Sequence, residues 1–293
     1  MRIGRRKTMG VHPEGTSDNE SAGGTGELTD DRFVGDADLA RWKTPAGRWL
    51  ASRAQRVSAR LGPYGVLILI LAAGAVVASL LAFTTGLVYE AVKEADGVAA
   101  LDHPVLEAAM TLRSPALDAA ATAYTDLGGG IGMPILAVIA TAVLVLRRRS
   151  WTPAILIVTA AAGSLLMTVA GKQLIGRARP PLSDAVPPYE YSPSFPSGHS
   201  LNSFVIAGIV AYLIILRCRS RRARAWTVTG AALFALTIGL SRVFLGHHWL
   251  TDVLAAWTLG AAWLVLVITA HRLYLTARKT EKQGHSLGGT AGG

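Results

Sequence analysis

The 293-residue chain is short of cysteine and of charge, since Cys218 is its single cysteine and charged residues make up 16% of it. One cysteine excludes an intrachain disulfide and any redox motif that needs two thiols. Cysteine and histidine are also never spaced as in a metal site. His247, His248 and Asp252 supply at most one corner of such a site, because no further ligand stands at ligand spacing. We therefore expect neither a metal nor a cofactor.

Apolar residues are abundant where charge is scarce, since 51% of the chain is hydrophobic. A water-soluble domain of this length rarely has such a composition. Six apolar runs stand out, and each is long enough, with some flanking residues, to cross a bilayer. They cover 63–88, 131–146, 152–170, 202–216, 226–240 and 253–270. The composition therefore predicts an all-α, polytopic membrane protein in which six transmembrane helices form a bundle.

The apolar runs divide the chain into four parts. Residues 1–48 are rich in glycine and in small polar or acidic residues without an apolar period, so we expect a disordered tail there. Residues 49–62 form a basic segment next to the membrane, residues 63–275 form the helical domain, and residues 276–293 form a second tail. We expect no chemistry in either tail.

The stretch between the first two runs, residues 89–130, mixes charged residues with many alanines. It is typical of short surface helices outside the membrane. Ser114 directly before Pro115, and Asp102 two residues before another proline, are signals for helix starts. Such helices could form a lid that admits a lipid, or they could simply connect two spans.

Basic residues outnumber acidic ones by 29 to 19, and they gather in clusters in alternate loops. Lysine and arginine close to membrane spans mark cytoplasmic loops. With six spans, all the clusters and both termini are expected in the cytoplasm, and the other loops on the extracytoplasmic side. The clusters are Arg53, Arg56 and Arg60; Arg147, Arg148 and Arg149; Arg217, Arg219, Arg221, Arg222 and Arg224; and Arg272, Arg278, Lys279 and Lys282. Charge that is divided among loops favours contact with membrane lipids over a nucleic-acid partner.

Two cations stand at the outer end of the third run. Lys172 and Arg179 are seven residues apart, so they would share one face of an α-helix that ends at Pro180. Paired cations suit a phosphate, because arginine donates bidentate hydrogen bonds and lysine adds a compact point charge. Both side chains could instead be interface anchors that reach the water.

A turn of proline, serine and glycine precedes the fourth run. Such a turn presents free backbone N–H groups at the start of a helix, where the helix dipole also attracts anions. The hydroxyl of Ser197 and nearby amides could therefore bind phosphate oxygens, and His199 could protonate a leaving group. An N-cap serine beside a surface histidine is the alternative.

The third segment ends the fifth run and opens the sixth. His248 and Asp252 are four residues apart, so on a helix the carboxylate can accept from one imidazole nitrogen and leave the other free as a nucleophile. Arg242 would add a third cation for a transferring phosphoryl group. A histidine pair at the membrane interface is the alternative, but it does not explain why all three segments fall on the same outer side.

In their order and spacing, the three segments resemble the type 2 phosphatidic acid phosphatase superfamily of lipid phosphate phosphatases. The resemblance covers about residues 63–275, and it implies six spans with an active site on the extracytoplasmic face. The matching patterns are Lys172 with Arg179 and Pro180; Pro196, Ser197, Gly198 and His199; and Ser241, Arg242, His248 and Asp252.

The resemblance implies a metal-independent hydrolysis of a lipid phosphate in two steps. His248 would attack the terminal phosphorus to form a phosphohistidine, with Asp252 holding its imidazole. His199 would protonate the leaving group and then activate water. Spacing selects His248 over His247, because Asp252 follows His248 by four residues. The phosphoryl oxygens would be bound by Lys172, Arg179, Ser197, Gly198 and Arg242.

The same resemblance implies a substrate class: undecaprenyl pyrophosphate or another polyprenyl pyrophosphate, phosphatidylglycerol phosphate, or phosphatidic acid. We favour a polyprenyl pyrophosphate, because recycling that carrier requires a phosphatase and the alanine- and glycine-rich spans suggest a bacterial chain. A lipid phosphotransferase, a vanadium haloperoxidase and a non-catalytic transporter that binds phospholipid headgroups are the alternatives. The oligomeric state is left open.

Overall fold

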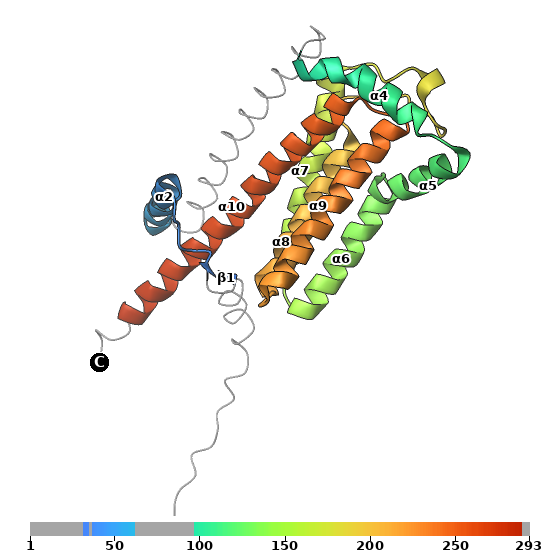
Figure 1. Ribbon diagram of the computed structural model, residues 1–293. Helices are drawn as coiled ribbons and strands as arrows, with labels where there is room; N and C mark the ends of the chain where they lie inside the picture. The colour runs from blue at the N-terminus through green and yellow to red at the C-terminus, as the bar shows by residue number, and fades with distance from the viewer. Residues whose placement is uncertain (1–31, 35–36, 62–96, 289–293) are drawn as a thin grey trace, which may run out of the picture.

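The structure, a computed structural model, describes residues 32–34, 37–61 and 97–288 (Figure 1). These residues are almost entirely helical, as the composition predicts. The first expected membrane span, residues 63–88, lies outside the described residues.

Long helices lie side by side and form a bundle (Figure 1). They are α6 (Gly132–Arg148), α7 (Thr152–Ile175), α8 (Gly198–Arg217), α9 (Arg221–Phe244) and α10 (Leu250–Gly288). Each of α7 to α10 contains a segment long and apolar enough to cross a membrane. α6 is long enough only together with the preceding segment Pro115–Gly128, across a bend of 50°. Within the described residues the candidate spans therefore number four, or five with the bent pair, and the total of six stays a prediction.

Successive helices of the bundle run in opposite directions. The ends of α7 and α9 therefore meet the starts of α8 and α10 at one end of the bundle. The three segments that the sequence analysis singled out all lie at this end. The arginines of the last turn of α6, and those between α8 and α9, lie at the opposite end. The site and the positive clusters are thus separated by the length of the bundle.

Short helices precede α6 and cover the site end of the bundle. They are η1 (Gly97–Leu101), α4 (Asp102–Thr111), α5 (Pro115–Thr125) and η2 (Asp126–Gly128), and α4 lies across the helix ends (Figure 1). Ser114 caps α5 as predicted, since its side chain accepts a hydrogen bond from the backbone N–H of Leu117. Asp102 is the first residue of α4 rather than its N-cap, and its carboxylate has other partners, described below.

The helices pack closely through glycines and a buried apolar stripe on α8. Leu201, Val205, Ile209 and Leu213 of that stripe are fully buried, which makes α8 the central helix of the described bundle. Gly163 of α7 lies against the indole ring of Trp263 of α10, and Trp263 Nε1 donates to the carbonyl of Ala160 at 3.0 Å. Small residues at such contacts let helix backbones approach each other in a membrane.

Part of the segment expected to be disordered has defined structure. Within residues 1–48, β1 (Phe33–Val34) pairs antiparallel with β2 (Ala37–Asp38), and α2 (Pro45–Leu61) begins. Arg272 of α10 stacks its guanidinium 4.1 Å from the centre of the Trp42 ring and donates to Leu39 O at 3.0 Å. These contacts explain the difference, because they attach a polar segment to α10. The expected second tail also differs, since α10 continues past residue 275 to Gly288.

Gly163 offers a test of this packing. A methyl group added there would clash with the Trp263 ring, whereas one added at Gly230 of α9 would meet no atom within 4 Å. We expect Gly163→Ala to destabilise the protein by about 1–3 kcal/mol through overpacking. Gly230→Ala, the matched control, should leave stability unchanged or raise it by up to about 1 kcal/mol through helix propensity. Thermal unfolding in detergent measures both, and equal unfolding temperatures would contradict the packing described here.

Candidate active site

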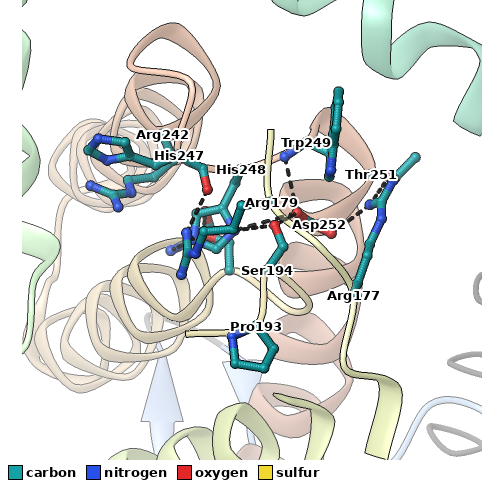
Figure 2. A network of polar contacts seen from close by, with 12 residues as sticks. Arg177, Arg179, Pro193, Ser194, Arg242, His247, His248, Trp249, Thr251 and Asp252 are labelled. Atoms are coloured by element: carbon teal, nitrogen blue, oxygen red, sulfur yellow. Dashed lines mark hydrogen bonds and ion pairs between the residues drawn. The ribbon is translucent and has the colours of Figure 1, made fainter. Parts of the chain in front are cut away.

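Figure 2 shows the polar network in which the three sequence segments meet. Arg177 and Arg179 come from the chain just after α7, Pro193 and Ser194 from the loop before α8, and Arg242 from the end of α9. His247, His248 and Trp249 form the turn before α10, and Thr251 and Asp252 belong to its first turn. Residues up to 75 positions apart thus contact one another directly.

His248 and Asp252 form a buried pair, as their spacing predicts. His248 Nδ1 lies 3.5 Å from Asp252 Oδ2, and the two side chains are 1% and 0% exposed. Ser194 lies between them: its hydroxyl donates to Asp252 Oδ2 and is 3.3 Å from His248 Nδ1. The carboxylate also accepts from the backbone N–H of Trp249 at 3.0 Å. Asp252 and Ser194 therefore hold the Nδ1 edge of the imidazole and leave Nε2 facing the opposite way.

The surroundings of His248 keep its imidazole neutral at neutral pH. Burial, together with Arg179 and Arg242, lowers the pKa of His248 to about 4, even though Asp252 acts in the opposite direction. Arg179 Nη1 lies 3.1 Å from His248 Nε2, which fits a lone pair on that nitrogen. A neutral imidazole with its Nδ1–H toward the carboxylate presents Nε2 as a nucleophile.

Lys172 and Arg179 do not share a helix face, which corrects the sequence prediction. α7 ends at Ile175, because Gly176 adopts a left-handed conformation (φ 61°) and donates to Lys172 O. Arg179 therefore lies on irregular chain after the helix, and Pro180 is not what ends it. Both cations nevertheless reach the same loop, since Lys172 Nζ and Arg179 Nη2 each donate to Ser192 Oγ at 3.1 Å.

Arg179 uses all five of its N–H donors within the protein. Nε donates to Ser192 O at 2.7 Å, Nη1 to His247 O at 2.5 Å and to His248 Nε2, and Nη2 to Ser192 Oγ and to Glu190 Oε2 at 2.8 Å. Any further ligand must therefore displace one of these partners. Glu190 is the single anion among them.

Glu190 joins two of the three predicted phosphate-binding cations. One carboxylate oxygen binds Arg179 and the other binds Arg242, whose side chain is 2% exposed. Burial alone would raise the pKa of Glu190, but Arg242 and Arg179 outweigh it and lower the pKa to about 2. Sequence reasoning missed Glu190. A lone glutamate in a proline-rich outer loop was the available signal, and only the fold places it between the arginines.

His199 and its neighbours begin α8 as predicted, but Ser197 has a structural partner. The Ser197 hydroxyl caps α8 by accepting from Ser200 N at 3.5 Å and from Ser200 Oγ at 2.8 Å. Its backbone N–H donates to Asp252 O at 3.3 Å. Gly129 leaves room beside the imidazole of His199, since an added methyl there would lie 3.2 Å from Nε2. His199 thus lies beside Gly129 at the start of α8, within electrostatic range of His248, while the Ser197 hydroxyl serves the helix cap.

His247 and His248 have different environments despite being adjacent. His247 Nε2 lies 2.7 Å from Val186 O, so this imidazole anchors the loop before α8. Its backbone carbonyl binds Arg179. Among the residues that the structure describes, no three histidine, cysteine or acidic side chains come together as metal ligands.

Behind Asp252 lies a second ion pair that sequence reasoning did not single out. Arg177 Nη1 donates to Asp252 Oδ1 at 2.6 Å, and Nη2 donates to Asp102 Oδ2 of α4 at 2.7 Å. The Arg177 guanidinium also lies 5.6 Å from the centre of the Trp249 ring. The Asp252 carboxylate is therefore held from both sides, by Ser194 and by Arg177.

Comparisons with known proteins agree with this arrangement. The sequence model of the PAP2 superfamily matches residues 152–274, which contain all three motifs. Phosphatidylglycerophosphatase B of Bacillus subtilis is 32% identical over 183 residues, which are 62% of this chain and 88% of that protein. The phthiocerol dimycocerosate exporter MmpL7 of Mycobacterium tuberculosis is 39% identical over 87 residues, but they are only 9% of the exporter.

A solved structure shares the fold as well. The crystal structure of a transmembrane PAP2 type phosphatidylglycerolphosphate phosphatase from Bacillus subtilis matches with a TM-score of 0.58 and 29% identity. The match covers 64% of this chain and 92% of that one. With its motifs gathered around one buried histidine at the end of an apolar helical bundle, the chain belongs to the PAP2 superfamily and is a membrane lipid phosphatase.

Proposed function

We propose that the protein removes the terminal phosphate from phosphatidylglycerol phosphate, with His248 as the nucleophile. One observation carries the proposal: the Nε2 lone pair of a neutral, buried imidazole faces Arg179 at 3.1 Å, and Arg179 shares a bound anion with Arg242. That is the environment an attacking nitrogen and a phosphoryl group require. The sequence match and the structure match from Bacillus subtilis are both named for phosphatidylglycerol phosphate, which favours this substrate over the polyprenyl pyrophosphate that the sequence analysis favoured.

The first step forms a phosphohistidine. The Nε2 lone pair of His248 attacks the phosphorus, a P–N bond forms, and the P–O bond to the lipid breaks. The leaving alkoxide takes a proton from His199, which enters the step as an imidazolium stabilised by the negative charge of the bound phosphate. Asp252 stabilises the positive charge that develops on the imidazole, because its carboxylate faces Nδ1 at 3.5 Å.

The second step restores the enzyme. Neutral His199, now a base, takes a proton from water as the water oxygen attacks the phosphorus, and the P–N bond breaks. The products are inorganic phosphate, a free His248 and a protonated His199. Lys172, Arg179, Arg242 and the Gly198 amide bind the equatorial oxygens, whose charge is largest in the transition state.

Glu190 occupies part of the phosphate position in the absence of substrate. Arg179 has no N–H donor left over, so a phosphoryl oxygen binds there by replacing the Glu190 carboxylate. A phosphate group has more negative charge than a carboxylate and can bridge the same two guanidinium groups. Substrate binding therefore includes release of Glu190 from Arg179 and Arg242.

The lipid panel tests the function itself. We expect the purified protein to release phosphate from phosphatidylglycerol phosphate, in the presence of EDTA, faster than from phosphatidic acid or a polyprenyl pyrophosphate. His248→Ala should lower the rate by more than about a thousandfold, since it removes the phosphoryl acceptor. His271→Gln is the control, because His271 is a buried histidine near the middle of α10, more than five helical turns from His248, and it bonds Tyr212. Phosphate release by His248→Ala at the wild-type rate would refute the mechanism. If another lipid of the panel were hydrolysed fastest, that lipid would be the substrate instead of phosphatidylglycerol phosphate.

Glu190 is tested separately. Glu190→Gln should lower the KM for lipid phosphate and the inhibition constant of inorganic phosphate by about 3- to 30-fold, because a neutral amide competes less well than a carboxylate for two guanidinium groups. Asp184→Asn in the same loop is the matched control, since the Asp184 side chain accepts from Ser183 at 3.0 Å and is remote from both arginines in its contacts. If Glu190 merely held the arginines in place, both constants would rise instead.

The orientation of the site is part of the proposal. The positive clusters lie at the opposite end of the bundle, and such clusters favour the cytoplasm, so the site faces outward and both termini face inward. In intact cells, a membrane-impermeant thiol reagent should label a cysteine introduced at Ser183 and should leave Cys218, between α8 and α9, unlabelled until the membrane is permeabilised. Labelling of Cys218 alone would reverse the orientation.

A further inference from the structure

Two charged residues behind the nucleophile pair have no role in the proposed steps, yet both are held in defined contacts. We propose that Arg177 and Asp102 are positioning residues for the phosphatase reaction: Asp102 fixes Arg177, and Arg177 fixes and partly neutralises Asp252, which orients His248. This inference rests on the proposed function only in taking His248 as the nucleophile. It makes α4, outside the bundle, a part of the catalytic arrangement.

Arg177 contacts the nucleophile pair with its side chain and with its backbone. Its Nη1 donates to Asp252 Oδ1 at 2.6 Å and to Thr251 Oγ1 at 2.7 Å. Its carbonyl accepts from the N–H of Ser194 at 2.8 Å, and the Ser194 hydroxyl is the group between His248 and Asp252. Arg177 therefore sets the position of both groups that face the Nδ1 edge of His248.

Asp102 is itself held in place by burial and by hydrogen bonds to both of its carboxylate oxygens. The side chain is 3% exposed, and Oδ2 accepts from Arg177 Nη2 at 2.7 Å. The same carboxylate accepts from the backbone N–H of Thr251 at 2.9 Å and from its hydroxyl at 2.7 Å. The ring of the next residue, His103, packs against the Trp249 ring at a tilt of 56°, with ring centres 4.7 Å apart. Two successive residues of α4 thus bind the turn that presents His248 and Asp252.

The charges alternate along this chain of contacts, from Asp102 to Arg177 to Asp252 to the imidazole. Without the Arg177 cation, the Asp252 carboxylate keeps only neutral donors, so it stabilises a protonated His248 more strongly. Without the Asp102 anion, Arg177 neutralises Asp252 more completely, so protonated His248 is stabilised less. The two changes therefore move the protonation of His248 in opposite directions, which a purely structural role would not do.

Other charged groups also surround His248, and the test leaves them unchanged. Each faces the site from a different element, so any shift that they cause is common to the wild type and the variants. They are Lys172 from α7, Arg179 after it, Glu190 from the loop before α8, His199 from α8, Arg242 from α9 and His247 from the following turn.

The measurement is the pH dependence of kcat/KM. Its acid limb, the fall of kcat/KM toward low pH, reports protonation of the nucleophile in the free enzyme. Burial and the surrounding charges together place the pKa of His248 at about 4. Arg177→Met should raise that pKa, so activity is lost at a pH about 1 unit higher. It should also lower kcat/KM at neutral pH by roughly 10- to 100-fold, the loss that is typical when a residue that orients an active-site group is removed. Asp102→Asn should move the limb to lower pH. Because one lipid substrate is used throughout, its own ionisation cancels from the comparison.

A double variant distinguishes the chain of contacts from independent effects. If Asp102 acts through Arg177, Asp102→Asn added to Arg177→Met should not shift the limb further. Arg177→Lys, which keeps a cation, should restore most of the wild-type limb and part of the rate. Thermal unfolding and gel filtration in detergent show that each variant is folded. Should Arg177→Met not fold, the Arg177→Lys and Asp102→Asn profiles still decide the matter.

Matched controls come from the same face of the molecule. Arg113→Met removes a cation that binds Phe244 O and Asp184 O, and Glu107→Gln removes an exposed anion from α4 itself. Neither should move the limb. The inference is overturned if the Arg177 and Asp102 variants lose rate with an unmoved limb, or if their shifts add. An inactive wild type, or an active His248→Ala, would instead count against the proposed function.

Discussion

The carboxylate of Asp252 is the group on which the site depends. It is fully buried, and a buried charge is costly unless it is paired and hydrogen-bonded. Its donors are Arg177, Ser194 and the Trp249 backbone, which come from three separate parts of the chain. Satisfying one carboxylate therefore brings the end of α7, the loop before α8 and the start of α10 together. His248 is oriented by the same group, so folding and the geometry of the proposed nucleophile have one common cause.

Charge compensation explains how so many ionised groups lie at the end of an apolar bundle. Arg177 lies between two carboxylates, and Glu190 lies between two guanidinium groups. In each case the pair of like charges is stable because an opposite charge is shared. The Arg177 cluster and the Glu190 cluster differ in their exposure and in their position at the site. Arg177 and its carboxylates are buried behind His248, whereas Glu190 is 31% exposed and binds the two arginines at the proposed phosphate position.

Local patterns predicted much of the molecule because they depend on neighbours in sequence. The apolar runs predicted the positions of α6 to α10, and Ser114 before a proline predicted the start of α5. The four-residue spacing of His248 and Asp252 predicted that their side chains form a pair. The prediction that Lys172 and Arg179 share a helix face was wrong, because Gly176 ends α7 by adopting a left-handed conformation. A proline four residues later was the more visible signal, but the glycine acts first.

The sequence by itself determined that this is an apolar helical protein with three cationic and imidazole segments at the same side, because hydropathy and spacing are local properties of the chain. It also identified the histidine that has a carboxylate one helical turn away. Only the tertiary structure decided that Glu190 lies between Arg179 and Arg242, that Ser194 lies between His248 and Asp252, and that Asp102 supports them from α4. Those contacts join residues between 11 and 149 positions apart, and their partners are determined by burial and charge balance, which no local sequence pattern contains.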